Sequence, residues 1–455
     1  MDSSRSSQRP TTSQKPLGVS TETDIETGPR EVRSSLGSQG GVVVSEDSLK
    51  LPKVDGGKDA WLFLVGCFVF EALVWGFPFS FGVFETYYTN NLPFSQHPSG
   101  IAAIGTCSSG GMYLIAPLTL YILEAWPSLR RLSSIFGLTI VVTALIASSF
   151  STQVCHLILT FLYAPTMFYL DEWFINKKGL AFGIMWAGVG TSGVIFPFLL
   201  TTLLDAHGFA TSLRVWAIAM LVLCLPLIHF VKPRLPTPAP PLLRQPISYA
   251  FLFTRTHVTL QLCNILEGLG FFLPAIYLPS YAQSLSLQPI AGTALLATLN
   301  IFSVLGSIGM GFLCDRLCVH TVIAISTAGA TLSVFLLWGL ATELPLLVVF
   351  AATYGFFAGG FSATWAGMMK EVQRVSTGAR MGTLMGLFAA GRGVGAVLSG
   401  PVSEVLMRKD HLGGGGEDGR GARFGYGTRY GVLIVFTGVS AGFGLLCFGA
   451  KRRVV

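Results

Sequence analysis

The feature that most constrains this chain is a series of long apolar segments, each near the length that a helix needs to cross a bilayer. About 20 helical residues span roughly 30 Å of hydrocarbon. Water is absent there, so backbone groups must be satisfied within each segment, which requires helices. The segments lie at 60–84, 99–122, 132–150, 154–170, 179–203, 212–231, 257–283, 290–314, 321–341, 344–368, 381–407 and 429–449. We therefore predict an all-α membrane protein with twelve transmembrane helices.

The charge content and its distribution support this class. Charged residues make up 12% of the chain, about half the share in soluble domains. The net charge of +7 does not indicate nucleic-acid binding, because no soluble basic stretch alternates with aromatic residues. With both termini in the cytosol, 23 of the 30 Lys and Arg residues fall on the cytosolic side and six outside. This bias predicts that both termini are cytosolic.

A Pro-rich stretch, VKPRLPTPAPPLLRQP, separates the sixth span from the seventh and is suited to a linker. The first 58 residues are rich in Ser, Thr, Gly and charge, which is typical of disorder. The predicted organisation is a disordered cytosolic tail at 1–58, a six-helix bundle at 59–231, a cytosolic linker at 232–256, a second six-helix bundle at 257–449 and a cytosolic C-terminus at 450–455.

The two halves also repeat each other in sequence. Glu71 precedes Pro78 by seven residues in the first span, and Glu267 precedes Pro274 by seven in the seventh. The fifth and eleventh spans align at an offset of 203. Gly179, Gly183, Ala187, Gly188 and Gly190 fall on Gly382, Gly386, Ala390, Gly391 and Gly393. Repeats of this kind place a substrate site near the bilayer midplane, between the halves.

The fifth span and the loop before it resemble a known family. The matching residues within YLDEWFINKKGLAFGIMWAGVGTSG (169–193) are Trp173, Phe174, Lys177, Lys178, Leu180, Ala181, Gly183, Ala187 and Gly188. The pattern is similar to that of the monocarboxylate transporter family, a branch of the major facilitator superfamily, and most closely to its fungal members. GFLCDR (311–316) resembles the superfamily's Gly-x-x-x-Asp-Arg signature. The resemblance covers roughly 59–450 in span order, and implies the major facilitator fold.

The chain departs from that family in two places. The first-span signature of Asp-Gly-Gly with aromatics is reduced to Asp59-Ala60-Trp61. Members that carry lactate use a lysine in the first span and an acid–base pair in the eighth. The first span here has no such lysine, and the eighth has no charge before Asp315. The sequence therefore supports a transporter without assigning lactate or pyruvate as cargo.

Three ionisable residues lie well inside predicted spans: Glu71, Glu267 and Arg392. A charge at the centre of a membrane helix costs at least about 2.5–3.5 kcal/mol. We interpret Arg392 as the docking point for an anionic group, since guanidinium matches a carboxylate in a bidentate geometry. Either Glu71 or Glu267 is then the candidate carrier of a coupling proton. The alternative is a structural ion pair between Arg392 and a glutamate, or an arginine that snorkels.

Other polar and aromatic residues complete the candidate site. Single aromatics in spans are commonly packing residues, and that alternative stays open for the cavity-lining set. The candidates for lining the cavity, besides Arg392, are Trp75, Asn300, Tyr354 and Trp365. The resemblance to the superfamily implies gating ties at the cytosolic ends of spans, against the alternative of solvated topology determinants. The candidate gating residues are Asp315, Arg316, Asp171, Lys177 and Lys178.

Taken together, these features predict a secondary active transporter of a small organic anion, working by alternating access. The driving force would be a proton gradient or the solute gradient itself. One alternative is a transporter that exports a fungal secondary metabolite, and another is a solute sensor that does not transport. We expect no enzyme, since seven scattered histidines form no metal site and no nucleotide or hydrolase motif is present.

We expect no cofactor, no metal and no nucleic acid partner. The predicted partners are the small organic anion, protons and the lipid bilayer, in an integral multi-pass protein of the plasma membrane. The oligomeric state is not predicted. The fourth span, 154–170, is short for a bilayer, which leaves open whether this form of the chain is active.

Overall fold

The computed structural model describes residues 52–90, 101–126, 129–151, 169–234, 249–376, 378–408 and 424–450. All regular structure in these ranges is helical. The helices of the first half are α1 (Lys58–Phe79), α2 (Phe81–Asn90), α3 (Ile101–Ala125), α4 (Arg130–Ser148), α6 (Leu170–Trp173) and α7 (Lys178–Ile228). The second half contains η6 (Tyr249–Phe253), α8 (Arg255–Phe271), α9 (Leu273–Ser284), α10 (Pro289–Arg316), α11 (Val319–Leu332), η7 (Ser333–Trp338), α12 (Leu344–Gly359), η8 (Gly360–Thr364), α13 (Trp365–Val375), α14 (Met381–Arg408), η9 (Gly425–Gly427), α15 (Gly431–Gly442) and η10 (Phe443–Ala450).

Within the described residues, eight helices are long and apolar enough to cross a membrane. Two shorter apolar helices, Gly110–Ala125 and Leu132–Ser148, accompany them. The all-α membrane class is therefore confirmed, and the chain is a multi-pass helical protein. Most of the predicted fourth span, 154–170, lies outside the described residues, and the number twelve stays a prediction.

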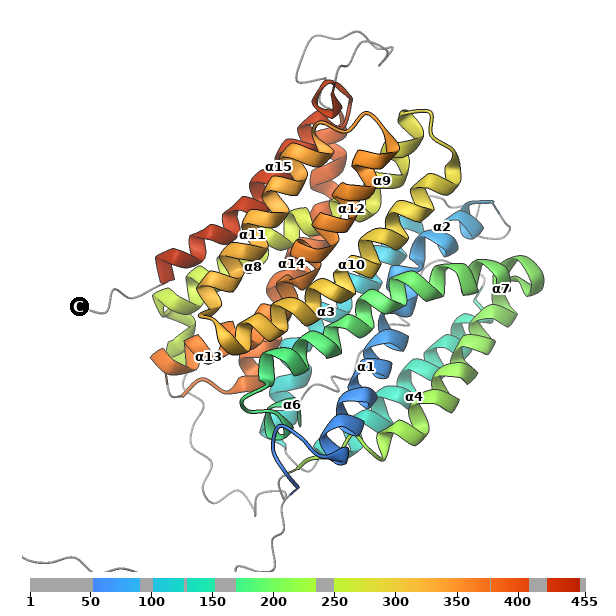
Figure 1. Cartoon of the computed structure of the whole chain (residues 1–455). Helices are drawn as coiled ribbons and strands as arrows, with labels where there is room; N and C mark the ends of the chain where they lie inside the picture. The colour runs from blue at the N-terminus through green and yellow to red at the C-terminus, as the bar shows by residue number, and fades with distance from the viewer. Residues whose placement is uncertain are drawn as a thin grey trace, which may run out of the picture. The chain divides into compact units, whose positions relative to one another are not determined.

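Helix α7 contains two of the predicted spans. A straight helix of its 51 residues would be roughly 75 Å long, more than twice the hydrocarbon thickness. The chain avoids this length at Gly208, whose φ of 74° and ψ of 175° lie outside the helical region. Figure 1 shows that the green ribbon of α7 reverses its direction, and its later part lies beside α4. The break falls between the predicted spans 179–203 and 212–231.

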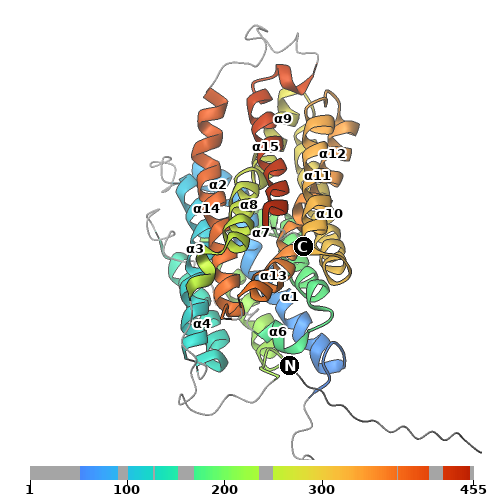
Figure 2. The same ribbon diagram turned by 90° about the vertical axis from the view of Figure 1, so that its left-hand side faces the viewer.

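Several of the repeated glycines of α7 and α14, Gly183 and Gly386 among them, lie where helices from opposite halves meet. Helix α7 packs along α10, and α14 packs along α3 (Figures 1 and 2). A Cβ atom added at Gly183 would lie 2.3 Å from the backbone oxygen of Ser307, and one at Gly386 would lie 2.7 Å from the Cα of Pro117. Only a residue without a side chain allows such a close approach. The 203-residue repeat therefore corresponds to two glycine-mediated contacts between the halves.

The predicted seventh span is broken near its middle. Helix α8 ends at Phe271 and α9 begins at Leu273. Pro274 has no N–H to donate to the carbonyl of Gly270, four residues earlier, and its ring clashes with a continuing helix. Tyr354 of α12 lies against this break, with its hydroxyl 3.5 Å from the backbone oxygen of Gly270 and 3.4 Å from that of Phe271. The break therefore exposes backbone polar groups that a neighbouring helix can contact.

The first prediction concerns the turn in α7. Gly208→Ala should lower the free energy of unfolding by about 1–3 kcal/mol, because its backbone conformation is essentially restricted to glycine. Thermal unfolding of the detergent-purified protein measures this. Gly400→Ala is the matched control, since a Cβ there meets nothing within 4 Å and no unusual φ is involved. Equal melting temperatures for the two variants would contradict the assignment of a strained turn.

Candidate functional site

A buried ion pair lies at the centre of the candidate site. Arg392 of α14 is 1% exposed, and its Nη1 donates to Oε2 of Glu267 of α8 at 2.6 Å. The Arg392 guanidinium carbon lies 4.1 Å from the centre of the Phe271 ring, a cation–π contact. Pairing of this kind offsets the large cost of removing each charge from water. The arrangement joins α8 and α14 within the second half of the chain.

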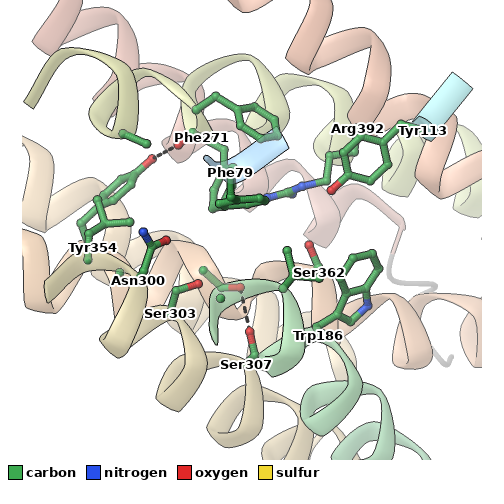
Figure 3. Close-up of a pocket in the computed structure, with 17 residues that line it drawn as sticks. Phe79, Tyr113, Trp186, Phe271, Asn300, Ser303, Ser307, Tyr354, Ser362 and Arg392 are labelled. Atoms are coloured by element: carbon green, nitrogen blue, oxygen red, sulfur yellow. Dashed lines mark hydrogen bonds between the residues drawn. The ribbon is translucent and has the colours of Figure 1, made fainter. Parts of the chain in front are cut away.

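A second line of polar side chains approaches Arg392 from the first half. Tyr113 of α3 faces the guanidinium (Figure 3). The Tyr113 ring packs on Trp75 of α1, with ring centres 4.7 Å apart. Trp75 Nε1 donates to Oε2 of Glu71 at 3.0 Å. The buried residues Glu71, Trp75 and Tyr113 therefore lead from α1 and α3 to the ion pair.

The ion pair borders a cavity of about 60 Å³ between the two halves. Arg392 and Tyr113 lie at one side of it, Asn300 and Tyr354 at the other, and Trp186 and Ser362 below (Figure 3). Residues from the first half that line it are Phe79, Tyr113, Trp186, Val189 and Gly190. Residues from the second half are Phe271, Phe272, Ala275, Leu299, Asn300, Ser303, Ser307, Tyr354, Gly355, Gly359, Ser362 and Arg392.

This lining is aromatic and weakly polar, with one cation. A site for a drug-sized molecule occupies about 300–1,000 Å³, several times the volume of this cavity. The halves must therefore separate before a molecule of that size can enter. Rings can stack on the aromatic walls, and the guanidinium can bind a carboxylate.

Asn300 and Trp365 are held by hydrogen bonds. Asn300 Nδ2 donates to the backbone oxygen of Gly193 at 3.2 Å, a contact between α10 and α7. Trp365 Nε1 donates to Oδ1 of Asn264 at 3.0 Å. The Trp365 ring packs edge-on against Trp186, with ring centres 5.3 Å apart. Trp365 therefore supports the cavity wall from behind Trp186.

The residues predicted as substrate ligands come together in this region. Arg392, Asn300 and Tyr354 line the cavity directly. Trp75 and Trp365 lie one layer behind, against Tyr113 and Trp186. Of the two predicted proton carriers, Glu267 is paired with Arg392 and Glu71 with Trp75. Their roles in binding and coupling stay predictions.

Asp315 connects the halves at the end of the bundle where α10 ends and α7 begins. Its carboxylate accepts from the backbone N–H of Gly179 at 2.7 Å and of Leu180 at 2.8 Å. The N-terminus of a helix carries unpaired N–H groups and a positive partial charge, which a carboxylate stabilises. Because Asp315 belongs to the second half and α7 to the first, this Asp315 cap holds the halves together at that end.

A similar cap joins the other pair of helices. Glu124, near the end of α3, accepts from the Thr383 backbone N–H at 3.2 Å and from its hydroxyl at 2.5 Å. Thr383 lies in the first turn of α14 and is equivalent to Leu180 in the 203-residue repeat. Sequence reasoning missed Glu124, because a charged residue at the end of a span also fits a simple topology determinant. In both pairs of helices, α10 with α7 and α3 with α14, a carboxylate accepts hydrogen bonds from the N-terminal turn of the partner helix.

Within the part of the chain that the structure describes, the ion pair and ring contact of the remaining predicted gating residues lie inside one half. Asp171 pairs with Lys178 inside the first half. Burial raises the pKa of Asp171, and the Lys178 ammonium partly opposes this. Lys177 is exposed. The exposed Arg316 stacks on Phe312 of its own helix, 4.1 Å from the ring centre. These placements favour local roles for the four residues.

A second, larger cavity of about 340 Å³ lies between the halves at the end where α7 and α14 begin. It combines charged groups with three methionines, whose flexible thioethers adapt to varied apolar partners. Its lining residues are Leu120, Glu124, Arg130, Asp171, Glu172, Phe182, Met369, Arg380, Met381, Gly382 and Met385. This cavity, here called the vestibule, lies beside the Glu124 cap.

The two halves of membrane helices therefore enclose an aromatic and weakly polar central cavity that contains one ion pair at its border. A family model described as the Major Facilitator Superfamily matches residues 154–400, more than half of the 455-residue chain. The chain belongs to the Major Facilitator Superfamily. This superfamily consists of transporters, which fits the expectation that the chain is not an enzyme.

Relatives and solved structures agree with this assignment. The chain is 25% identical to the MFS-type transporter pynF of Aspergillus niger over 382 residues, covering 81% of this chain and 86% of that one. It is 28% identical to the agnestins efflux protein AgnL12 of Paecilomyces divaricatus over 377 residues, covering 80% and 85%. A bacterial homologue of the iron transporter ferroportin, solved in an outward-facing state with soaked iron, aligns with a TM-score of 0.61 and 13% identity, covering 86% and 99%. That last likeness shows the fold alone.

One statement from the sequence was wrong. The triplet Asp-Gly-Gly is present at 55–57, immediately before α1, rather than reduced to Asp59-Ala60-Trp61. The structure shows Asp55 contacting the loop before α7, so the triplet lies outside the membrane helix.

The second prediction tests the ion pair. Arg392→Met should destabilise the protein by about 3–5 kcal/mol, because the carboxylate of Glu267 loses the charge that compensates it. The double variant Arg392→Met with Glu267→Gln should recover most of this loss. Chemical unfolding in detergent, evaluated as a double-mutant cycle, measures the coupling. Additive effects of the two substitutions would rule out a direct interaction.

The third prediction tests the Asp315 cap. Cys314 lies beside Gly179 at the α7–α10 contact, so its reaction with a maleimide reports separation of these helices. Asp315→Asn should raise its labelling rate about tenfold or more, since charge-assisted hydrogen bonds contribute about 1.5–3 kcal/mol. Trypsin cleavage after Arg316 places Cys314 and the exposed Cys318 in different peptides. The labelling of Cys318 therefore serves as the internal standard. Unchanged labelling of Cys314 would mean that the cap does not hold the halves together.

Proposed function

We propose that this chain exports a fungal secondary metabolite, an organic anion with an aromatic body, by alternating access. The observation that carries the proposal is the cavity lining, in which the single cation Arg392 occurs together with the aromatic residues Tyr113, Trp186, Phe271 and Tyr354. Such a lining suits a large aromatic acid better than a compact monocarboxylate. The similarity to the agnestins efflux protein supports export of this kind of cargo.

The ion pair supplies a mechanism for binding. A cargo carboxylate competes with Glu267 for the Arg392 guanidinium, whose Nη1 lies 2.6 Å from Glu267 Oε2. Once displaced, the Glu267 carboxylate is buried without a counter-charge and takes up a proton. Anion and proton then move together, so that the transported unit is neutral. Export in this scheme follows the cargo's own gradient, which synthesis in the cell maintains.

The two caps supply the conformational step. Asp315 and Glu124 hold the halves together at one end, predicted to be cytosolic. Opening the vestibule at that end for cargo requires both caps to break, and closing it restores them. The excess of Lys and Arg on that side supports cytosolic termini, and we propose the plasma membrane as the location.

A small monocarboxylate is the second candidate cargo. It is favoured by the family pattern at 173–188, by the Asp-Gly-Gly triplet at 55–57 and by the small volume of the central cavity, about 60 Å³. Both candidates dock a carboxylate on Arg392. They differ in the size of the molecule that moves, which a transport measurement separates.

The fourth prediction is the transport measurement. Proteoliposomes loaded with labelled acids, from lactate and benzoate to polycyclic aromatic carboxylates, should release the aromatic acids faster, and acidification of the lumen should accelerate release. Arg392→Gln should reduce the initial rate at least tenfold, because cargo loses its charge-assisted hydrogen bonds. Arg255→Gln, at an exposed arginine of the same half, is the matched control and should leave the rate unchanged.

Three results would contradict parts of this proposal. Equal release of lactate and aromatic acids would support the small monocarboxylate instead. Binding of an aromatic acid without release would support a sensor. Release that is unaffected by Arg392→Gln would exclude this residue as the docking point, whichever cargo moves.

A further inference from the structure

The Asp55 carboxylate is held by the loop before α7. It accepts hydrogen bonds from three successive backbone N–H groups: Ile175 at 2.8 Å, Asn176 at 3.0 Å and Lys177 at 3.0 Å. The Asn176 side-chain amide donates to it as well, at 2.9 Å. Successive N–H groups that converge in this way form an anion-binding concavity. Here the concavity is filled by a side chain of the same protein.

The backbone around Asp55 is adapted to this contact. Asp55 has a φ of 59°, uncommon for a residue other than glycine. Its own N–H donates to the backbone oxygen of Trp173 at 3.0 Å. The Trp173 ring in turn stacks on Phe63 of α1, with ring centres 5.9 Å apart. The loop is therefore fixed to the start of α1 through both backbone and side-chain contacts.

The end of α7 joins the same assembly. Trp173 Nε1 donates to the backbone oxygen of Lys232 at 3.0 Å. The Arg234 backbone N–H donates to Glu172 Oε2 at 3.0 Å, and its Nε donates to the backbone oxygen of Pro52 at 2.8 Å. The start of α1 is therefore connected to both ends of α7 through residues 52–57, 172–177 and 231–234.

Two carboxylates consequently bind successive backbone N–H groups in the loop before α7 and in its first turn. Asp55 of the first half binds the N–H groups at 175–177, and Asp315 of the second half binds those of Gly179 and Leu180. Burial would raise the pKa of Asp55, but the backbone hydrogen bonds from Lys177, Asn176 and Ile175 outweigh it and lower the pKa. The charge of Asp55 therefore persists at ordinary pH and is lost only when the pH falls through this lowered value.

We propose that Asp55 is a positioning residue for the Asp315 cap: by holding the loop at 175–177, it directs the N–H groups of Gly179 and Leu180 toward the second half. The inference rests on the proposed alternating access. It assigns the residues before α1 a part in closing that end of the transporter. Loss of the Asp55 carboxylate leaves the loop free to turn, and the cap forms less often.

The test uses the full chain in detergent and the maleimide labelling of Cys314. Asp55→Gly removes the carboxylate, suits the positive φ and leaves the three N–H groups free to bind a small anion. Labelling should rise about fivefold or more relative to the Cys318 standard. Acetate, at tens to hundreds of millimolar, should return it toward the wild-type rate, whereas chloride at equal ionic strength should not. Asp59→Asn, at an exposed aspartate four residues away, is the control and should label like wild type.

Two further variants separate positioning from folding. Asp315→Asn should label fast with or without acetate, because its defect lies in the cap itself. Asp55→Asn retains an acceptor without the charge, and should label at an intermediate rate that acetate does not change. If Asp55→Gly does not fold, the labelling rate of Asp55→Asn still tests the role of the Asp55 charge.

Each remaining outcome would overturn the proposal. If both Asp55 variants label at the wild-type rate while Asp315→Asn labels faster, Asp55 does not act on the cap. If Asp55→Gly labels faster but ignores acetate, its effect is a general loosening of the fold. The labelling assay contains no cargo. Its result can therefore be interpreted even if the transport measurement finds no transport.

Discussion

The burial of two opposite charges inside an apolar bundle determines how the rest of the site is built. Arg392 and Glu267 are tolerable at that depth only as a pair, 2.6 Å apart, so α8 and α14 must lie close together. The same helix that supplies Glu267 is interrupted by Pro274, and the carbonyl groups at that break face Tyr354. Aromatic rings then enclose the guanidinium. The arrangement of the polar centre therefore depends on the pairing of Arg392 with Glu267.

The contact between the halves depends on glycines and carboxylates together. Gly183 and Gly386 bring the helix backbones of opposite halves into contact, which hydrophobic side chains would prevent. Dispersion forces between these closely approaching surfaces then contribute to the contact. Asp315 and Glu124 fix which ends of the helices meet, because a carboxylate is stabilised at the N-terminal end of a helix and not at the C-terminal end. A joint of this kind is close-packed yet separable, as rocking of one half against the other requires.

The sequence predicted the membrane class, the turn within 179–231 and the ionisable residues of the centre, because charge and length are readable from composition along the chain. It could not decide whether Arg392 docks an anionic group or forms an ion pair with a glutamate, because packing across the bundle determines which helices face each other. Tyr113 and Trp186 were missed because an aromatic residue in an apolar span gives the same signal whether it faces lipid or a cavity. Glu124 was missed because position alone does not distinguish a cap from a topology determinant. Asp55 was overlooked since its partners lie about 120 residues away.

The location of both charges of the central pair on one half has an electrical consequence. When that half tilts through the membrane field, Arg392 and Glu267 move together and their charges cancel. A single unpaired charge crossing the whole potential would exchange about 2.3 kcal/mol for every 100 mV. The pair exchanges almost nothing, so in the proposed alternating-access cycle its movement adds almost no dependence on membrane voltage. Under that proposal, a change in the membrane potential leaves the reorientation of this pair unaffected.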